Sequence, residues 1–301
     1  MMDESGENSP PPDDPGHDHP LAWAAPGFRP PALYGTMRDR INAGTHFRID
    51  GDGPTVMLIH GVGLDLDMWA AQASALAARY TVIRYDMLGH GASAKPSGAL
   101  HLASLVAQLD MLHGYFRLGR SVVVGFSMGA LVARAFAAAH GERLAGLVLL
   151  NGVYDRSPAE RDSILERLRQ GETDGPNSLI EAALGRWFSP GFRAAAPDTV
   201  AAVVDRLRAN DPRNFLAAYR TFAEADDAAA GLIPTLPCPT LVATGEDDRG
   251  STPAMATALA AAIEGAECHV LPGLAHLAPI EGADRVNALL LDFLDRIGRA
   301  D

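Results

Sequence analysis

The sequence predicts an α/β fold in which a mostly parallel sheet carries helices on both faces and is interrupted by a helical insertion. Short continuous apolar runs, such as Thr55–Ile59 and Leu144–Leu150, are typical of strands buried on both faces of a parallel sheet. Helical patterns alternate with these runs, which implies right-handed crossover connections. The alternation stops near residue 153 and resumes at Thr240–Gly245, so we expect an insertion between two strands of one sheet.

Length and composition fit one large domain of this kind. The 301 residues are 48% hydrophobic, which is enough to bury a substantial core. The net charge of −12 argues against nucleic acid or an anionic membrane as a partner. The sequence has neither an 18-residue apolar run nor the pattern of a secretory signal. We therefore expect a cytoplasmic protein, a monomer or a homodimer, that acts on a small molecule.

The domain is expected to follow a disordered tail. Residues 1–31 are rich in Pro, Asp, Gly and Ser and hold too few apolar side chains to offset the entropy of ordering. From Tyr34 to Ile49 the alternation predicts an opening antiparallel strand or hairpin. The core should comprise residues 32–152 and 237–301. Its patterns predict strands at 55–59, 81–85, 144–150, 240–245 and 267–273, a strand that starts at Ser121, and helices at 69–79, 100–118 and 283–297.

The remaining segment, residues 153–236, shows no strand-like run. Gly and Pro divide it into charged helical stretches at 159–169, 178–187, 197–209 and 213–225. Short helices inserted between two strands of one sheet predict a helical lid over the crevice at the carboxyl ends of the strands.

One stretch predicts the chemistry. From Ser121 a β-branched run leads into Gly125-Phe-Ser127-Met-Gly129 and continues as an alanine-rich helical pattern. A serine at such a strand-turn-helix junction takes a strained conformation, so its neighbours must be small, as Gly125 and Gly129 are. The N-terminus of the helix would face an oxyanion that forms beside the serine. We therefore expect Ser127 to be a nucleophile.

A serine nucleophile needs a base that takes its proton and a carboxylate that orients and stabilises that base. His276 follows the predicted strand 267–273, whereas the other histidines of the core belong to turns, helix faces or the middle of a strand. The chain order serine, acid, histidine is expected when an elbow serine lies in mid-sheet. We therefore expect His276 to be the base.

The acid should come from the loop 246–253, which follows the strand 240–245 and contains Asp247 and Asp248. Asp155, which follows the preceding strand, is a third candidate. We prefer Asp248. The two cysteines form no metal-binding spacing, and we expect neither a metal nor a cofactor.

On these motifs the chain, apart from its tail, resembles the serine hydrolases of the α/β-hydrolase fold, which implies an eight-stranded, mostly parallel sheet. His60-Gly-Val62 resembles the oxyanion segment of that family, and residues 89–93, Gly-His-Gly-Ala-Ser, resemble its glycine loop. Gly245-Glu-Asp-Asp248 resembles its Gly-x-x-Asp acid turn, and this register selects Asp248. The resemblance implies an oxyanion hole made by the backbone N–H groups of Val62 and Met128.

Three further pieces, residues 60–69, 186–190 and 275–281, resemble the 3-oxoadipate enol-lactonase branch of that family. This resemblance implies a carboxylic ester or a lactone as the substrate, cleaved through an acyl-enzyme. A carbon–carbon or amide hydrolase with the same triad, or a non-catalytic receptor of the same fold, is the alternative. An enol-lactone acid would need a cation for its carboxylate, so the candidate substrate-binding residues of the lid are Arg186, Arg213 and Arg220, with Trp187 beside the first.

Overall fold

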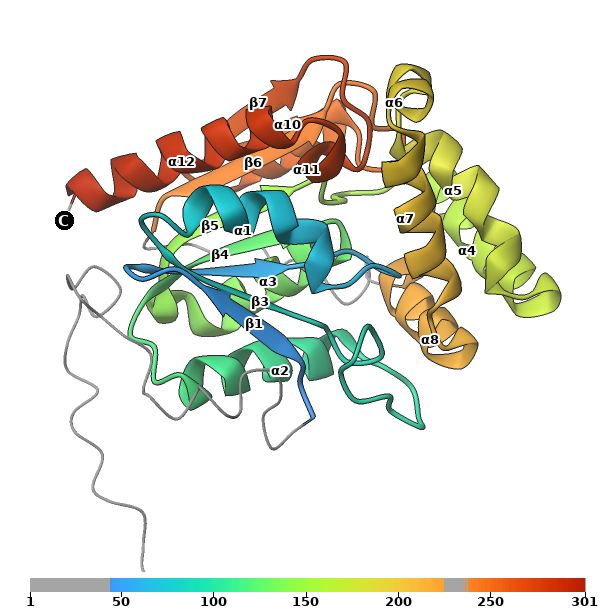
Figure 1. The fold of residues 1–301 in the computed structure, drawn as a ribbon, viewed down its shortest axis with the longest axis horizontal. Coiled ribbons are helices and arrows are strands. Elements are labelled where there is room, and N and C mark those ends of the chain that lie inside the picture. Colours follow the sequence, from blue (N-terminus) through green and yellow to red (C-terminus); the bar gives the residue numbers. More distant parts are fainter. Residues whose placement is uncertain (1–43, 225–235, 237, 301) are drawn as a thin grey trace, which may run out of the picture.

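The computed structural model describes residues 44–224, 236 and 238–300, and a sheet of seven strands forms its centre (Figure 1). The strands lie in the order β1-β3-β2-β4-β5-β6-β7. The first strand runs antiparallel to its neighbour, and every other neighbouring pair is parallel. The predicted fold class is confirmed. The strands are β1 (Phe47–Asp50), β2 (Thr55–Ile59), β3 (Thr81–Tyr85), β4 (Ser121–Phe126), β5 (Leu144–Leu150), β6 (Thr240–Gly245) and β7 (Glu267–Leu271).

The family resemblance implies a sheet of eight strands, whereas the described residues form a sheet of seven. The opening hairpin was expected to begin at Tyr34, and residues 34–43 lie outside the described part of the chain, as does the expected tail at 1–31. At the other edge, β7 ends at Leu271, two residues before its expected end. The chain turns there through Pro272 and Gly273, whose φ of 64° suits glycine.

Burial along the strands follows the sequence pattern. Strands β2 to β6 are buried over their whole length, as their continuous apolar runs predict. Strand β7 lies at the edge of the sheet, and half-buried and exposed side chains alternate along it. The central strands therefore carry the core on both of their faces.

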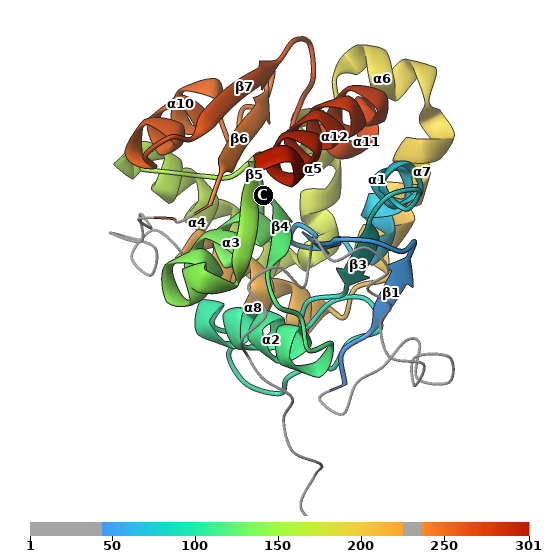
Figure 2. The same cartoon turned by 90° about the vertical axis from the view of Figure 1, so that its left-hand side faces the viewer.

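Helices cover both faces of the sheet (Figure 2). On one face α2 (Leu102–Tyr115), α3 (Met128–His140) and α10 (Pro253–Ala262) contribute to one apolar core. On the other face α1 (Ala70–Leu76) and α12 (Ala283–Ala300) pack against each other and contribute to a second core. Both faces of the sheet are thus covered by helices, as is required when crossover helices connect parallel strands.

Some helix boundaries differ from those expected. The helix expected at 69–79 begins as a 3₁₀ turn, η2 (Leu66–Trp69), and α1 ends at Leu76. Helix α10 was not expected, although Thr252 caps it and Pro253 opens it. Two further short elements are η3 (Gly141–Arg143) and α11 (Ala278–Glu281).

The described part of the insertion contains six helical segments, and they group beyond the carboxyl ends of the central strands (Figure 1). Five of them begin with proline, which is favoured at the first position of a helix and marks where each of these segments starts. The short α6 was not expected from the sequence. The segments are α4 (Pro158–Asp174), η4 (Pro176–Leu179), α5 (Ile180–Trp187), α6 (Pro190–Ala195), α7 (Pro197–Arg208) and α8 (Pro212–Ala223).

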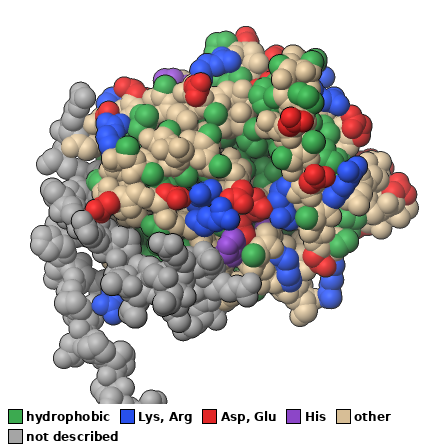
Figure 3. All heavy atoms as spheres, in the orientation of Figure 1, with side chains coloured by type: hydrophobic (Ala, Val, Ile, Leu, Met, Phe, Trp, Pro, Cys, Tyr) green, Lys and Arg blue, Asp and Glu red, His purple; other side chains and the backbone are tan. Residues whose placement is uncertain are grey.

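The surface mixes charges of both signs. Acidic and basic side chains are interspersed over the face seen in Figure 3, so the negative net charge does not gather there in one patch. Within the described ranges no helix has both the length and the apolar character needed to cross a bilayer.

Buried histidines predict a pH-dependent stability. Burial, with the charges of Arg143 and His140, lowers the pKa of His113 to about 3. An unfolded histidine titrates near pH ~6.5, so between about pH 3 and 6.5 the unfolded chain binds a proton that the folded protein does not. The free energy of unfolding must therefore fall as the pH falls through this range. His113→Gln should make that fall less steep by about 1.4 kcal/mol per pH unit between roughly pH 4 and 6.

Urea unfolding at several pH values measures this slope. The variant His101→Gln, at an exposed position next to the same helix, is the control. Equal slopes for His113→Gln and the wild type would show that His113 does not titrate differently in the folded protein.

Candidate active site

Ser127 lies in the turn between β4 and α3 with φ 53° and ψ −113°, a conformation that side-chain-bearing residues rarely adopt. Two glycines make this turn possible. A Cβ at Gly125 would meet the carbonyl oxygen of Gly129, and a Cβ at Gly129 would meet the carbonyl oxygens of Ile59 and His60. The close approach of α3 to β2 and β4 therefore requires both glycines and holds Ser127 at the carboxyl edge of the sheet.

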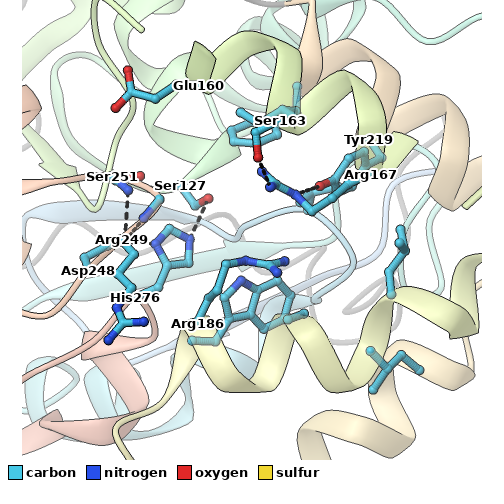
Figure 4. Close-up of a pocket in the computed structure, with 18 of the residues that line it drawn as sticks. Ser127, Glu160, Ser163, Arg167, Arg186, Tyr219, Asp248, Arg249, Ser251 and His276 are labelled. Carbon is cyan, nitrogen blue, oxygen red and sulfur yellow. Dashed lines mark hydrogen bonds and ion pairs between the residues drawn. The ribbon is translucent and has the colours of Figure 1, made fainter. Parts of the chain in front are cut away.

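The loop after β7 brings His276 to Ser127 (Figure 4). Its Nε2 lies 3.0 Å from Ser127 Oγ, and its Nδ1 lies 2.7 Å from Asp248 Oδ2. All three side chains are buried. With Nδ1–H donated to the carboxylate, Nε2 is free to accept the serine proton. The structure thus brings together the three residues that the sequence predicted as nucleophile, base and acid.

Of the three candidate acids, only Asp248 lies beside His276. Asp248 follows β6 and lines the cavity described below, whereas Asp247 and Asp155 are exposed and do not line it. Asp155 takes a positive φ of 48° in the loop after β5, which turns the chain toward the insertion. The register that selects Asp248 therefore agrees with the geometry.

Hydrogen bonds keep the buried Asp248 carboxylate ionised. Burial by itself would raise its pKa, but the charge of His276 and the hydrogen bonds outweigh this and hold the pKa below its usual value. The backbone N–H groups of Gly250 and Ser251 donate to Oδ1 at 2.8 and 2.9 Å. The negative charge is thus available to stabilise an imidazolium.

Asn151, directly after β5, is a site residue that sequence reasoning missed. Its Nδ2 donates to Asp248 Oδ2 at 2.8 Å, the same oxygen that meets His276, and it also reaches Thr244 Oγ1 at 3.2 Å. Asn151 is 1% exposed, and its φ of 50° falls in the left-handed region that asparagine tolerates better than most residues. The sequence contained one signal of this role: Asn151 is a polar residue directly after the wholly apolar strand β5.

Val62 and Met128 flank Ser127, where the oxyanion hole was predicted. Met128 is the first residue of α3, so its N–H group has no partner within the helix. The turn after β2 packs directly on the elbow, because a Cβ at Gly61 would meet the Phe126 ring and lie 3.4 Å from the Ser127 Cβ. Both predicted donors therefore belong to backbone that borders the serine.

The buried ring of His60 fixes this turn. Its Nε2 accepts the N–H of Met87 at 2.9 Å, and its Nδ1 donates to the carbonyl oxygen of Gly61 at 2.8 Å. Burial lowers the pKa of His60, so the ring stays neutral and can hold both bonds. His60 thus supports the position of Val62 through its neighbour.

A cavity of about 290 Å³ lies between Ser127 and the insertion (Figure 4). Ser127, Asp248 and His276 line one part of it, and helices α4, α5 and α8 supply most of the remaining wall. No three His, Cys, Asp or Glu side chains of the described residues are grouped as metal ligands would be. The apolar part of the wall includes Val62, Ile164, Leu179, Ile180, Ala183, Leu207 and Phe215.

Two of the predicted substrate-binding arginines lie elsewhere. Arg186 and Trp187 line the cavity, but Arg213 and Arg220 do not. Both are exposed on α8, where Arg213 donates to a loop carbonyl oxygen and Arg220 pairs with two glutamates. Phe215 and Tyr219 occupy the side of this amphipathic helix that faces the cavity. The structure therefore places Arg213 and Arg220 away from the cavity wall.

The end of α5 is hydrogen bonded to the loop that carries the base. The carbonyl oxygen of Trp187 accepts the N–H of Leu277 at 2.9 Å. The carboxylate of Glu281 accepts the N–H groups of Ser189, in the insertion, and of Ala275, in the loop, each at 3.1 Å. The insertion and the position of the base are thus connected.

Comparisons with known proteins agree with this fold. A model of the alpha/beta hydrolase family matches residues 56–289. An (E)-2-((N-methylformamido)methylene)succinate hydrolase of Acinetobacter baylyi is 29% identical over 265 residues, 86% of this chain and 97% of that protein. An esterase structure from Thermogutta terrifontis, with malate bound, has a TM-score of 0.78 and 30% identity over 84% of this chain and 94% of its own. The enol-lactonase structure from Burkholderia xenovorans LB400 has a TM-score of 0.76 and 32% identity over 83% of this chain and 96% of its own.

Asp248→Asn should lower kcat for an activated ester such as p-nitrophenyl butyrate roughly 10³- to 10⁴-fold with little change in KM, because an amide cannot stabilise the imidazolium. Asp247→Asn, one residue away and exposed, should stay close to the wild type. Steady-state kinetics of both variants measure the difference. The opposite ranking would move the acid by one residue, and activity in both variants would point to Asp155.

Asn151→Ala should lower kcat about tenfold at unchanged KM, because it removes one hydrogen bond to the charged carboxylate of Asp248. The matched control is Asn287→Ala, since the side chain of Asn287 bonds Gln72 and does not line the cavity. The same kinetic assay applies. If Asn151→Ala keeps the wild-type kcat, the amide does not assist Asp248.

Proposed function

Because the chain belongs to the alpha/beta hydrolase family, we propose that it is a serine hydrolase that cleaves a carboxylic ester or a lactone through an acyl-enzyme, in the manner of a 3-oxoadipate enol-lactonase. One observation carries this proposal: the imidazole of His276 lies between Ser127 Oγ at 3.0 Å and Asp248 Oδ2 at 2.7 Å. The esterase and the enol-lactonase that resemble the chain at 30% and 32% identity support the choice of bond.

In the first half of the reaction His276 takes the proton of Ser127 while Ser127 Oγ attacks the ester carbonyl carbon. The N–H groups of Val62 and Met128 stabilise the negative charge that develops on the carbonyl oxygen. Asp248 stabilises the imidazolium. His276 then returns the proton to the leaving oxygen, and the acyl group remains on Ser127.

In the second half His276 takes a proton from a water molecule as that water attacks the acyl carbon, and His276 then gives the proton to Ser127 Oγ as the bond between Oγ and the acyl carbon breaks. With a lactone, the leaving oxygen stays attached to the acyl group, so one open-chain acid is the product. A cavity of about 290 Å³ suits a small substrate of this kind.

A carbon–carbon or amide hydrolase would use the same three residues, and a receptor would keep them without turnover. A burst of p-nitrophenol equal to one acyl group per protein would separate the enzyme from the receptor. Turnover of a panel of lactones, compared with ring-fission dienones and anilides, would separate the ester hydrolase from the other two enzymes.

A fluorophosphonate probe should add one label to the protein, on Ser127, because its hydroxyl faces the Nε2 of His276. Ser127→Ala should abolish labelling, and Ser163→Ala, which also removes a hydroxyl from the cavity wall, should not. His276→Ala should slow ester turnover by on the order of 10³-fold or more, since serine and histidine act as one unit. Intact-protein mass spectrometry measures the label. Labelling that persists in Ser127→Ala would contradict the assignment.

A further inference from the structure

Helices α7 and α8 of the insertion pack on the turn that follows β2, at the carboxyl end of the central strands (Figure 1). A Cβ at Gly63 would lie 2.7 Å from the ring of Phe215 and 2.9 Å from a methyl group of Leu207. These two side chains line the active-site cavity together with Val62. The insertion therefore contacts the backbone that carries Val62, one of the two proposed oxyanion donors.

The core holds the peptide group to which the Val62 N–H belongs. The carbonyl oxygen of Gly61 accepts the Nδ1–H of His60 at 2.8 Å and the N–H of Leu64 at 3.3 Å. In a trans peptide the carbonyl and the N–H of the next residue point in opposite directions, so these bonds also set the direction of the Val62 N–H. The bond from Leu64 closes a turn whose third residue, Gly63, has a φ of 76° that suits glycine. A shift of Gly63 would therefore alter the direction of that N–H.

Asn210 holds this turn from the side of the insertion. It lies just after α7, its side chain is buried, and its Nδ2 donates to the carbonyl oxygen of Gly63 at 2.7 Å. The same nitrogen reaches the carbonyl oxygens of Arg206 and Leu207 at 3.2 and 3.1 Å. Three carbonyl oxygens around one atom identify it as the amide nitrogen. The two longer bonds cap the end of α7, whereas the shortest one joins the insertion to the turn.

An ion pair adds a second connection between α7 and the same segment. Arg206 Nη1 lies 3.1 Å from Asp65 Oδ2, and both side chains are half-buried. Asp65 follows the turn directly and caps η2 by accepting the N–H of Asp67 at 3.1 Å. The insertion thus holds the segment at Gly63 through a neutral hydrogen bond and at Asp65 through a charged pair.

The position of a donor decides what an oxyanion hole contributes. Donors act on the oxygen that becomes charged at a distance of roughly 2.7–3.1 Å, and the loss of one donor slows catalysis roughly 10²- to 10³-fold. The acceptor of the Asn210 bond is the carbonyl of Gly63, the residue next to Val62. Loosening this bond would therefore move the donor as well as the insertion.

We propose that Asn210 is a positioning residue of the oxyanion hole: through the carbonyl oxygen of Gly63 it fixes the turn that directs the Val62 N–H at the developing oxyanion. This inference rests on the proposed hydrolase function. Arg206 supports the same turn through Asp65. The insertion then stabilises the transition state in addition to forming the cavity wall.

Asn210→Ala should lower kcat for p-nitrophenyl butyrate about tenfold with little change in KM, because a misplaced donor loses part of the contribution of a whole one. Arg206→Met should act in the same direction by a smaller factor, about two- to fivefold, since a partly exposed ion pair contributes less. The matched control is Asn214→Ala. Asn214 is also buried in the insertion, but its amide donates to Asp211 at the start of α8, so its loss should leave kcat unchanged.

A thionoester distinguishes a misplaced donor from a general loss of structure. Sulfur accepts hydrogen bonds more weakly than oxygen, so the oxyanion hole contributes less to the attack on a thionoester. Asn210→Ala should therefore lower kcat/KM about tenfold for p-nitrophenyl butyrate and less than about threefold for its thiono analogue. Asn151→Ala, which acts through Asp248, should lower both alike. Equal losses for the two substrates in Asn210→Ala would overturn the positioning role. Thermal unfolding of every variant checks that it is folded.

Binding of butyl trifluoromethyl ketone separates this proposal from the proposed function. Ser127 Oγ adds to the carbonyl carbon of the ketone, the hydroxyl proton passes to His276, and the carbonyl oxygen takes the negative charge that the hole binds. Asn210→Ala should raise the dissociation constant of this adduct about tenfold, as measured by calorimetric titration.

The two proposals can fail independently. Weaker ketone binding by Asn210→Ala, in a protein whose wild type turns over no ester or lactone, would overturn the ester hydrolase function and keep the positioning role. Wild-type ester turnover together with wild-type ketone affinity in Asn210→Ala would overturn the positioning role and keep the hydrolase.

Discussion

The close packing of α3 on the sheet is the constraint on which the rest of the site depends. No Cβ fits at Gly125 or Gly129, because the carbonyl oxygens of the elbow and of the turn after β2 occupy that space. This approach forces Ser127 into its positive φ and points the first N–H groups of the helix at the same spot. A strained residue persists only where its surroundings fix it, and here buried strands and a buried helix do so. Backbone packing therefore sets the serine before any side chain takes part.

The second requirement is a buried charge that stays ionised. Asp248 is buried, and desolvation there opposes its negative charge. Three groups of donors offset this effect: the imidazole of His276, the side-chain amide of Asn151 and the backbone N–H groups of Gly250 and Ser251. The turn that offers those backbone donors follows Gly245, where a Cβ would meet the carbonyl oxygen of Leu274. The acid and the base are thus fixed by the same kind of close contact that fixes the serine.

The sequence predicted the parts of the fold and of the site that depend on interactions between residues close together in the chain. The buried strands and the position of Ser127 follow from continuous apolar runs and from glycines, and both signals lie within a few residues. The position of Arg213 and Arg220 relative to the cavity depends on how α8 packs over the sheet, with Phe215 and Tyr219 on its inner side, and that packing involves distant parts of the chain. The role of Asn151 depends on a partner from a distant strand. Helices α6 and α10 carry cap and proline signals that were present in the sequence and were not weighed.

The hydrogen bonds between the end of α5 and the loop of His276 make the insertion less modular than its place between two strands suggests. An insertion grafted from a relative would bring a new cavity wall, but it would also replace the Trp187 carbonyl and the Ser189 N–H that anchor Leu277 and Glu281. Such a chimera would misplace the imidazole unless the graft were cut before Trp187 or carried a matching loop. A change in the insertion that alters the cavity wall can therefore also alter the position of the base.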